Sequence, residues 1–76
     1  MTLLELKNEQ KARLITLPNN EAAERLEALG LHCGKVIVKI SNMPFGGPVT
    51  VMLQGRHFAV SHSIASEIEI ELIKDD

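Results

Sequence analysis

Apolar and polar residues alternate with a period of two through residues 35–41, a pattern typical of a half-buried β-strand. One set of alternating positions is β-branched, and the other carries mostly lysine and serine. The first set is Val36, Val38 and Ile40, and the second is Lys35, Lys39 and Ser41. We expect the valine and isoleucine side to line the core and the lysine side to face solvent.

Four further strands are predicted, at residues 10–17, 49–54, 56–61 and 68–72. Gly55 makes a tight turn between the second and third of these, so they form a hairpin. In the first, the neighbouring apolar residues Leu14 and Ile15 break the period of two and predict a β-bulge. The positions expected to face the core in the other strands are Val49, Val51, Leu53, Ile68, Ile70 and Leu72.

Helical segments are predicted at two places, and residues 21–29 form the longer one. Asn20 can cap its N-terminus and Gly30 can end it in a left-handed conformation. Its apolar face is expected to consist of Ala22, Leu26 and Leu29. Ser63 is the expected cap of one helical turn at residues 64–67 before the last strand, and the N-terminal residues Leu3, Leu4 and Leu6 are expected to pack on one end of the domain.

The loop of residues 42–48 interrupts the strand pattern, because Pro44, Gly46, Gly47 and Pro48 cannot continue either neighbouring strand. Phe45, one of two aromatic residues in the chain, lies at its centre. Two interpretations remain open. Phe45 either folds inward to plug a small core or forms an exposed apolar knob, together with Met43, for a partner.

Five short strands and one helix in 76 residues predict a mostly β fold, a small and strongly bent barrel in a single domain that spans residues 1–76. With 45% hydrophobic residues the chain is too apolar to be disordered. Because so small a body has little room for a substrate cavity, we expect a non-enzymatic module without a cofactor.

Charge and cysteine content exclude several classes of protein. The net charge of −2 and the lack of a basic cluster argue against nucleic-acid binding. Cys33 is the only cysteine, so no intramolecular disulfide can form, and the start of the chain does not resemble a signal peptide. No run of about 18 apolar residues is present. We therefore expect a cytoplasmic protein that does not span a membrane.

The order of several short motifs resembles the FeoA family, the small accessory proteins of bacterial ferrous iron transport. The motif positions are Leu29, Gly30, Leu31, Gly34, Pro44, Phe45, Gly46, Gly47, Pro48, Val49, Gly55, Ala65 and Ile68. The resemblance implies an SH3-like barrel with an added helix. It also implies a cytosolic, non-enzymatic partner of FeoB, the membrane transporter whose cytosolic part binds guanine nucleotide.

Two departures from the family pattern concern loops. Where relatives carry basic residues after the fourth strand, this chain has Ser61-His62-Ser63. Near the N-terminus, Asn8-Glu9 replaces a glycine turn. Since asparagine tolerates the left-handed region, we expect Asn8 to preserve that turn.

Metal-ligating residue types are present, but their spacing is poor. The weak candidates are His32, Cys33, His57 and His62. Neighbouring residues in an extended segment point apart, and no CxxC or HxxxH pattern occurs. We therefore expect no metal site. Catalysis by Cys33 is not expected either, because the sequence shows no adjacent base.

The residues expected to contact a partner are Leu31, Met43, Phe45 and Met52. We expect this partner to be the cytosolic part of FeoB, and exposed strand edges also allow a weak homodimer. One alternative is an SH3-like module related to the C-terminal domain of iron-dependent repressors. Two expectations argue against it: the sequence contains no helix-turn-helix, and we expect the chain to be complete. Another is a small metal carrier that uses the histidines and Cys33.

Overall fold

The computed structural model of the chain describes residues 1–42 and 45–74. These residues form one five-stranded sheet with the order β4-β3-β2-β1-β5, in which all neighbouring strands are antiparallel. The strands are β1 (Lys11–Thr16), β2 (Val36–Asn42), β3 (Val49–Leu53), β4 (Arg56–Val60) and β5 (Glu69–Ile73). The helical segments are η1 (Leu3–Glu5), α1 (Glu21–Ala28) and α2 (His62–Ala65).

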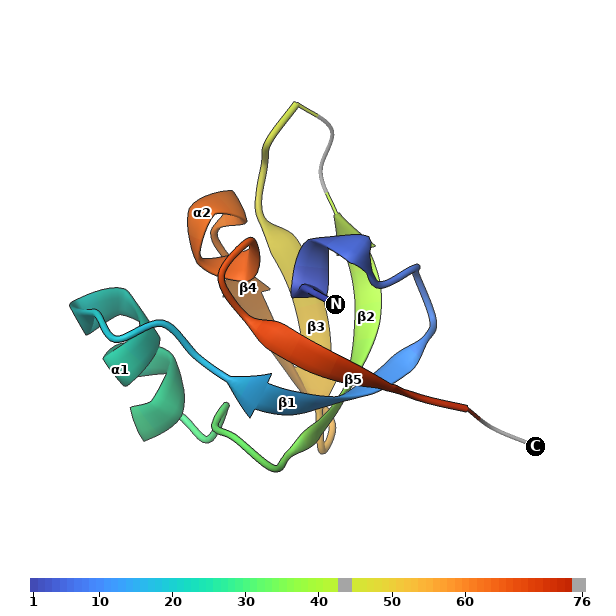
Figure 1. The fold of residues 1–76 in the computed structure, drawn as a ribbon, viewed down its shortest axis with the longest axis horizontal. Coiled ribbons are helices and arrows are strands. Elements are labelled where there is room, and N and C mark those ends of the chain that lie inside the picture. The colour runs from blue at the N-terminus through green and yellow to red at the C-terminus, as the bar shows by residue number, and fades with distance from the viewer. Residues whose placement is uncertain (43–44, 75–76) are drawn as a thin grey trace.

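The expected mostly β fold is confirmed: α1 lies between β1 and β2, and α2 precedes β5. In Figure 1 the sheet curls around an interior, with α1 on its periphery and the β2–β3 hairpin extending away from the other strands. The N-terminal segment closes one side, where Thr2 pairs with Glu69. Within η1, the Thr2 N–H donates to Glu5 Oε1 at 2.8 Å, and this bond lowers the pKa of the Glu5 carboxyl.

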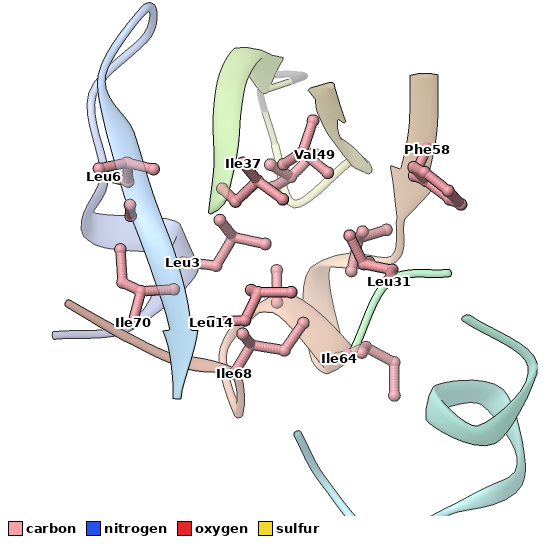
Figure 2. Close-up of a cluster of buried hydrophobic side chains, with 14 of the residues drawn as sticks. Leu3, Leu6, Leu14, Leu31, Ile37, Val49, Phe58, Ile64, Ile68 and Ile70 are labelled. Carbon is pink, nitrogen blue, oxygen red and sulfur yellow. The ribbon is translucent and has the colours of Figure 1, made fainter. Parts of the chain in front are cut away.

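The interior is filled by aliphatic side chains from every strand and from the N-terminal segment, as Figure 2 shows. Leu3 and Leu6 are buried within it, so the prediction that the N-terminal leucines pack on the domain is confirmed. The predicted core positions of β3 are also confirmed. The buried cluster consists of Leu3, Leu6, Ala12, Leu14, Leu31, Ile37, Val49, Val51, Leu53, Phe58, Val60, Ile64, Ala65, Ile68 and Ile70.

The prediction of which face of β2 lines the core is wrong. Ile37 and Lys39 point inward, with 0% and 1% of their surface exposed, whereas Val36 and Ile40 are both 37% exposed. The pairing explains the inversion, because Ile37 lies opposite the buried Ala12. A shift of one residue turns every side chain of a strand to the other face. Because the strand carries apolar residues on both sides, its period alone could not decide which side faces the core.

The expected apolar face of α1 is also wrong in part. Ala23 is buried and Leu26 is partly buried, but Ala22 is exposed and Leu29 is 57% exposed. The core position next in the chain is taken by Leu31 instead. The expected cap is confirmed, since Asn20 Oδ1 accepts from the Ala23 N–H at 2.9 Å.

Three local predictions have mixed outcomes. The β-bulge in β1 is confirmed, because the pairing with β5 shifts register between Leu14 and Thr16. The cap of α2 is Ser61 rather than Ser63, with Ser61 Oγ accepting from the Ile64 N–H. The left-handed residue near the N-terminus is Glu9, with φ 72°, and not Asn8.

Candidate functional site

The tip of the β2–β3 hairpin is the clearest candidate for a binding site. The two strands pair up to Asn42 opposite Val49, and the described part of the connecting loop, residues 45–48, projects from the body of the molecule (Figure 1). Phe45 lies in this loop and has a relative exposure of 104%. An aromatic side chain of this size is normally buried to a large extent. The interpretation of Phe45 as a core plug is therefore wrong.

The backbone at this tip is unusual for an aromatic residue. Phe45 has φ 60° and Gly46 has φ 78°. Glycine adopts such angles freely, but a bulky residue rarely does, because its Cβ approaches the backbone. Consecutive positive values occur at the two central positions of a type I′ turn, where asparagine followed by glycine is favoured. Phe45 thus occupies a strained position and gains no burial from it.

The other residues expected to contact a partner lie in different environments. Met52 is half-buried on the outer side of β3. Leu31 is fully buried, so in this structure it belongs to the core and not to an exposed surface. Met43 and Pro44 lie outside the described residues. Of the expected set, Phe45 and Met52 are therefore accessible in the described part of the chain.

The glycines of the expected motif have conformational roles. Gly30, Gly34, Gly46 and Gly55 all have positive φ values. At Gly30, where φ is 112°, an added Cβ would also meet Arg56 Nη2 at 2.9 Å. The positive φ favours glycine there, whereas the contact would require only a shift of the flexible Arg56 side chain.

Arg56 joins the end of α1 to β4, a contact that the sequence pattern did not indicate. Its Nη2 donates to the Leu29 carbonyl, and its guanidinium carbon lies 5.1 Å from the centre of the Phe58 ring. The arginine thereby supplies a donor to a carbonyl at the C-terminus of the helix, where free carbonyls need partners. It holds the helix end beside the barrel.

The weak metal candidates do not converge. His32, Cys33, His57 and His62 are all exposed, on the turn after α1, on β4 and on α2. Among the described residues no group of three or more histidine, cysteine, aspartate or glutamate side chains is placed to hold a metal ion. Their arrangement in this part of the chain offers no chelating set.

Lys39 is the residue that sequence reasoning missed most clearly. Its Nζ donates to the backbone carbonyls of Leu3, Leu4 and Leu6 at 3.3, 3.2 and 2.6 Å. These carbonyls belong to the first two residues of η1 and to Leu6, which follows it. Burial lowers the pKa of the Lys39 ammonium from its usual value of 10.5. The only sequence signal is a lysine in an otherwise apolar strand, which reads equally well as a solvent-facing position.

None of the helices in the described residues is long and apolar enough to cross a membrane.

Three solved structures are similar to this chain over almost its whole length. An FeoA protein from Chlorobium tepidum has 27% identity and a TM-score of 0.88, covering 100% of this chain and 73% of its own. An iron(II) transport protein A from Clostridium thermocellum has 27% identity and a TM-score of 0.85 over 96% of this chain. The match spans 46% of the length of that Clostridium chain.

The third structure supplies the fold name. It is an FeoA from Stenotrophomonas maltophilia in complex with zinc, described as a prokaryotic SH3 domain protein and a candidate ferrous iron transport activating factor. It has 28% identity and a TM-score of 0.77, covering 93% of this chain and 89% of its own. The expected SH3-like fold is thus confirmed.

A second group of similar structures belongs to a metal-activated repressor. ScaR with bound zinc has 27% identity and a TM-score of 0.81, and the match covers 96% of this chain but 37% of the repressor. No curated protein sequence matches the chain.

The sequence itself matches the model of the FeoA domain over residues 1–72. This match includes β1 to β4 completely, and β5 up to Leu72. The chain therefore belongs to the FeoA family, whose members are associated with ferrous iron transport and adopt the SH3-like fold.

Proposed function

We propose that this protein is a non-enzymatic accessory protein of ferrous iron transport that binds the cytosolic part of a FeoB-type transporter. It acts in the cytoplasm as a single FeoA-like domain of residues 1–76, and its role is to modulate the transporter through contact. Membership of the FeoA family supports the choice of partner. The similar structure described as a transport activating factor supports the regulatory role.

The observation that carries this proposal is the position of Phe45. Its side chain is fully exposed, and its backbone has a φ value that aromatic residues avoid. Strain of this kind costs about 1–2 kcal/mol and persists where function requires it. Exposed aromatic residues are also typical anchors of protein interfaces. Phe45 is therefore the proposed anchor that enters an apolar pocket of the transporter.

Isothermal titration of the purified transporter part with this protein tests the proposal. Phe45→Ala should weaken binding by about 30-fold, since loss of an aromatic anchor costs about 2 kcal/mol. Leu29→Ala is a matched control, because Leu29 is an exposed apolar side chain at the end of α1. The control should bind like the wild type. Equal affinities of the wild type and Phe45→Ala would contradict the proposal.

A second candidate function is supported by the similarity to ScaR. In that case the chain would be a module that responds to metal in the manner of a repressor domain. Titration with Mn²⁺ and Zn²⁺ alone distinguishes the two functions. Metal-dependent shifts centred on His32, Cys33, His57 or His62, without binding to the transporter, would favour the second.

A further inference from the structure

β2 carries apolar side chains on both of its faces. Ile37 fills the interior, while on the opposite side Val36 and Ile40 are each 37% exposed and Val38 is half-buried. Strands that are apolar on both sides are typical of sheets that are covered on both sides. The outer side of β2 therefore has the composition of a contact surface.

The strand register extends this surface over the neighbouring strands. Val38 lies opposite Met52 in β3, and Thr50 lies opposite Ala59 in β4. Residues directly opposite each other in antiparallel strands share one face of the sheet. We call this surface the outer hairpin face, and it consists of Val36, Val38, Ile40, Thr50, Met52, His57 and Ala59.

The outer hairpin face contains no aspartate, glutamate, lysine or arginine in a chain with 24% of these residues, and none of them occurs in positions 40–55. The same uncharged segment includes the exposed Phe45, so the tip and the outer hairpin face are continuous along the chain. Single exposed apolar residues are normal on protein surfaces, but a contiguous apolar area marks an interaction site.

The charges that border the outer hairpin face are basic at the end away from the tip. Lys11 lies opposite Val38 and Arg13 lies opposite Val36. Glu71 lies beyond Arg13, one strand further from the face. At the end near the tip, the Glu9 N–H donates to the Lys39 carbonyl, so an acidic residue borders that end. The basic border therefore follows β1.

Acidic residues near the outer hairpin face are Glu9 and Glu71, and others lie on α1. Three glutamates lie on α1, at Glu21, Glu24 and Glu27, and the net charge of the chain is −2. A basic border beside an apolar face is thus a local feature and does not follow from the overall charge. Opposite charges across an interface steer encounter and fix its register.

We propose that the outer hairpin face is a second contact surface, which binds an apolar segment of the transporter's cytosolic part whose acidic side chains meet Arg13. This proposal rests on the proposed function, because it assumes the same partner. It extends the contact from Phe45 along the outer side of β2 and β3.

A sample of this protein labelled at its methyl groups and its backbone amides, so that Phe45 is also observed, is titrated with the cytosolic part of the transporter and tests the proposal by chemical shift. Shifts at Val36, Val38, Ile40 and Met52 together with the Phe45 tip are the expected result. Shifts at the tip alone would overturn the second surface and leave the proposed function intact. The lack of shifts at both places would overturn both.

Charge reversal tests the acidic character of the partner. Arg13→Glu should weaken binding by about fivefold in dilute salt, and the loss should shrink as salt screens the contact. Arg13→Lys keeps the charge and should retain wild-type affinity. Because Arg13 Nη1 also donates to the Gly34 carbonyl at 3.2 Å, the melting temperature of each variant is measured alongside. Wild-type affinity of a folded Arg13→Glu variant would overturn the proposal.

Glu71→Lys is the matched control, since Glu71 is the cross-strand neighbour of Arg13 and has the opposite charge. It adds positive charge beside the basic border and should bind at least as tightly as the wild type. Weaker binding of Glu71→Lys would contradict an acidic partner.

Two other occupants of the outer hairpin face would show themselves without the transporter. A second copy of this chain could offer the acidic α1 with its exposed Leu29. Sedimentation of the protein alone should show a monomer. A dimer that is weakened by both Leu29→Ser and Arg13→Glu would overturn the proposal. Shifts of the same methyl groups with phosphatidylglycerol vesicles alone would overturn it in favour of a membrane surface.

Discussion

Lys39 and Phe45 belong to the same β2–β3 hairpin. Each lies in the environment that its side chain usually avoids, because the lysine is buried and the phenylalanine is exposed. Lys39 is 1% exposed and Phe45 is 104% exposed. The lysine is buried with three backbone carbonyls as acceptors for its ammonium group. The aromatic ring lies in solvent, on a backbone with φ 60°.

The difference lies in what the fold gains from each residue. The three hydrogen bonds of Lys39 connect β2 to the N-terminal segment, which closes one side of the barrel, so the fold accounts for its burial. Phe45 contributes no burial to the core and occupies a strained conformation. An unusual position that stabilises the fold is structural, whereas one that weakens it points to function.

The largest expected effect is a loss of stability at Lys39. Lys39→Ala removes the buried stem and leaves the carbonyls of Leu3, Leu4 and Leu6 without their donor, which should cost about 3 kcal/mol. Urea unfolding measures the loss. Lys39→Met keeps most of the volume and removes only the ammonium group, so it should cost about 1–2 kcal/mol. If Lys39→Met is as stable as the wild type, the packing of the side-chain stem alone accounts for the contribution of Lys39 to stability.

The opposite effect is expected at the hairpin tip. Phe45→Asn places asparagine before Gly46, the pair favoured at positive φ in a type I′ turn. Relief of the strain should stabilise the fold by about 1 kcal/mol and raise the melting temperature by about 4–8 °C. Thermal unfolding followed by circular dichroism measures this change. A lower melting temperature would mean that Phe45 supports the fold.

The pH dependence of stability sharpens the account of Lys39. Because its folded pKa lies below its unfolded value of 10.5, the unfolded chain binds more protons in the interval between the two values. The free energy of unfolding of the wild type should therefore rise with pH through that interval, compared with that of Lys39→Met. Urea unfolding of both proteins over this range measures the difference. Parallel curves would show that the pKa of Lys39 does not change on folding.

The smallest effect is expected at Leu29, which the sequence pattern placed in the core. Since Leu29 is 57% exposed, Leu29→Ser should change stability by less than about 0.5 kcal/mol. The same substitution at the buried Leu31 should cost several kcal/mol and serves as the contrast. Comparable losses at both positions would contradict the placement of α1.

Much of the fold follows from local patterns in the sequence. Alternation predicted the strands, the apolar pair Leu14 and Ile15 predicted the bulge, and Asn20 predicted the start of α1. These features depend on neighbouring residues and on turn chemistry, which the sequence displays directly. The face of β2 depends on pairing with distant strands, and a strand with apolar residues on both sides gives no local sign of it.

The candidate site could be predicted only in part. The proline and glycine residues located the loop, but they could not determine whether Phe45 is buried. The acceptors of Lys39 lie 33 to 36 residues away in sequence, so no local pattern could identify them. Leu31 was expected at an interface, yet its side chain lies in the core.

In the proposed function, Phe45 stays exposed for a partner although its backbone conformation weakens the fold. The most direct test measures two properties of Phe45→Asn beside the wild type, the melting temperature and the affinity for the cytosolic part of the transporter. The account predicts a higher melting temperature together with binding at least about tenfold weaker, a difference of about 1.4 kcal/mol. Unchanged affinity in the stabilised variant would contradict it.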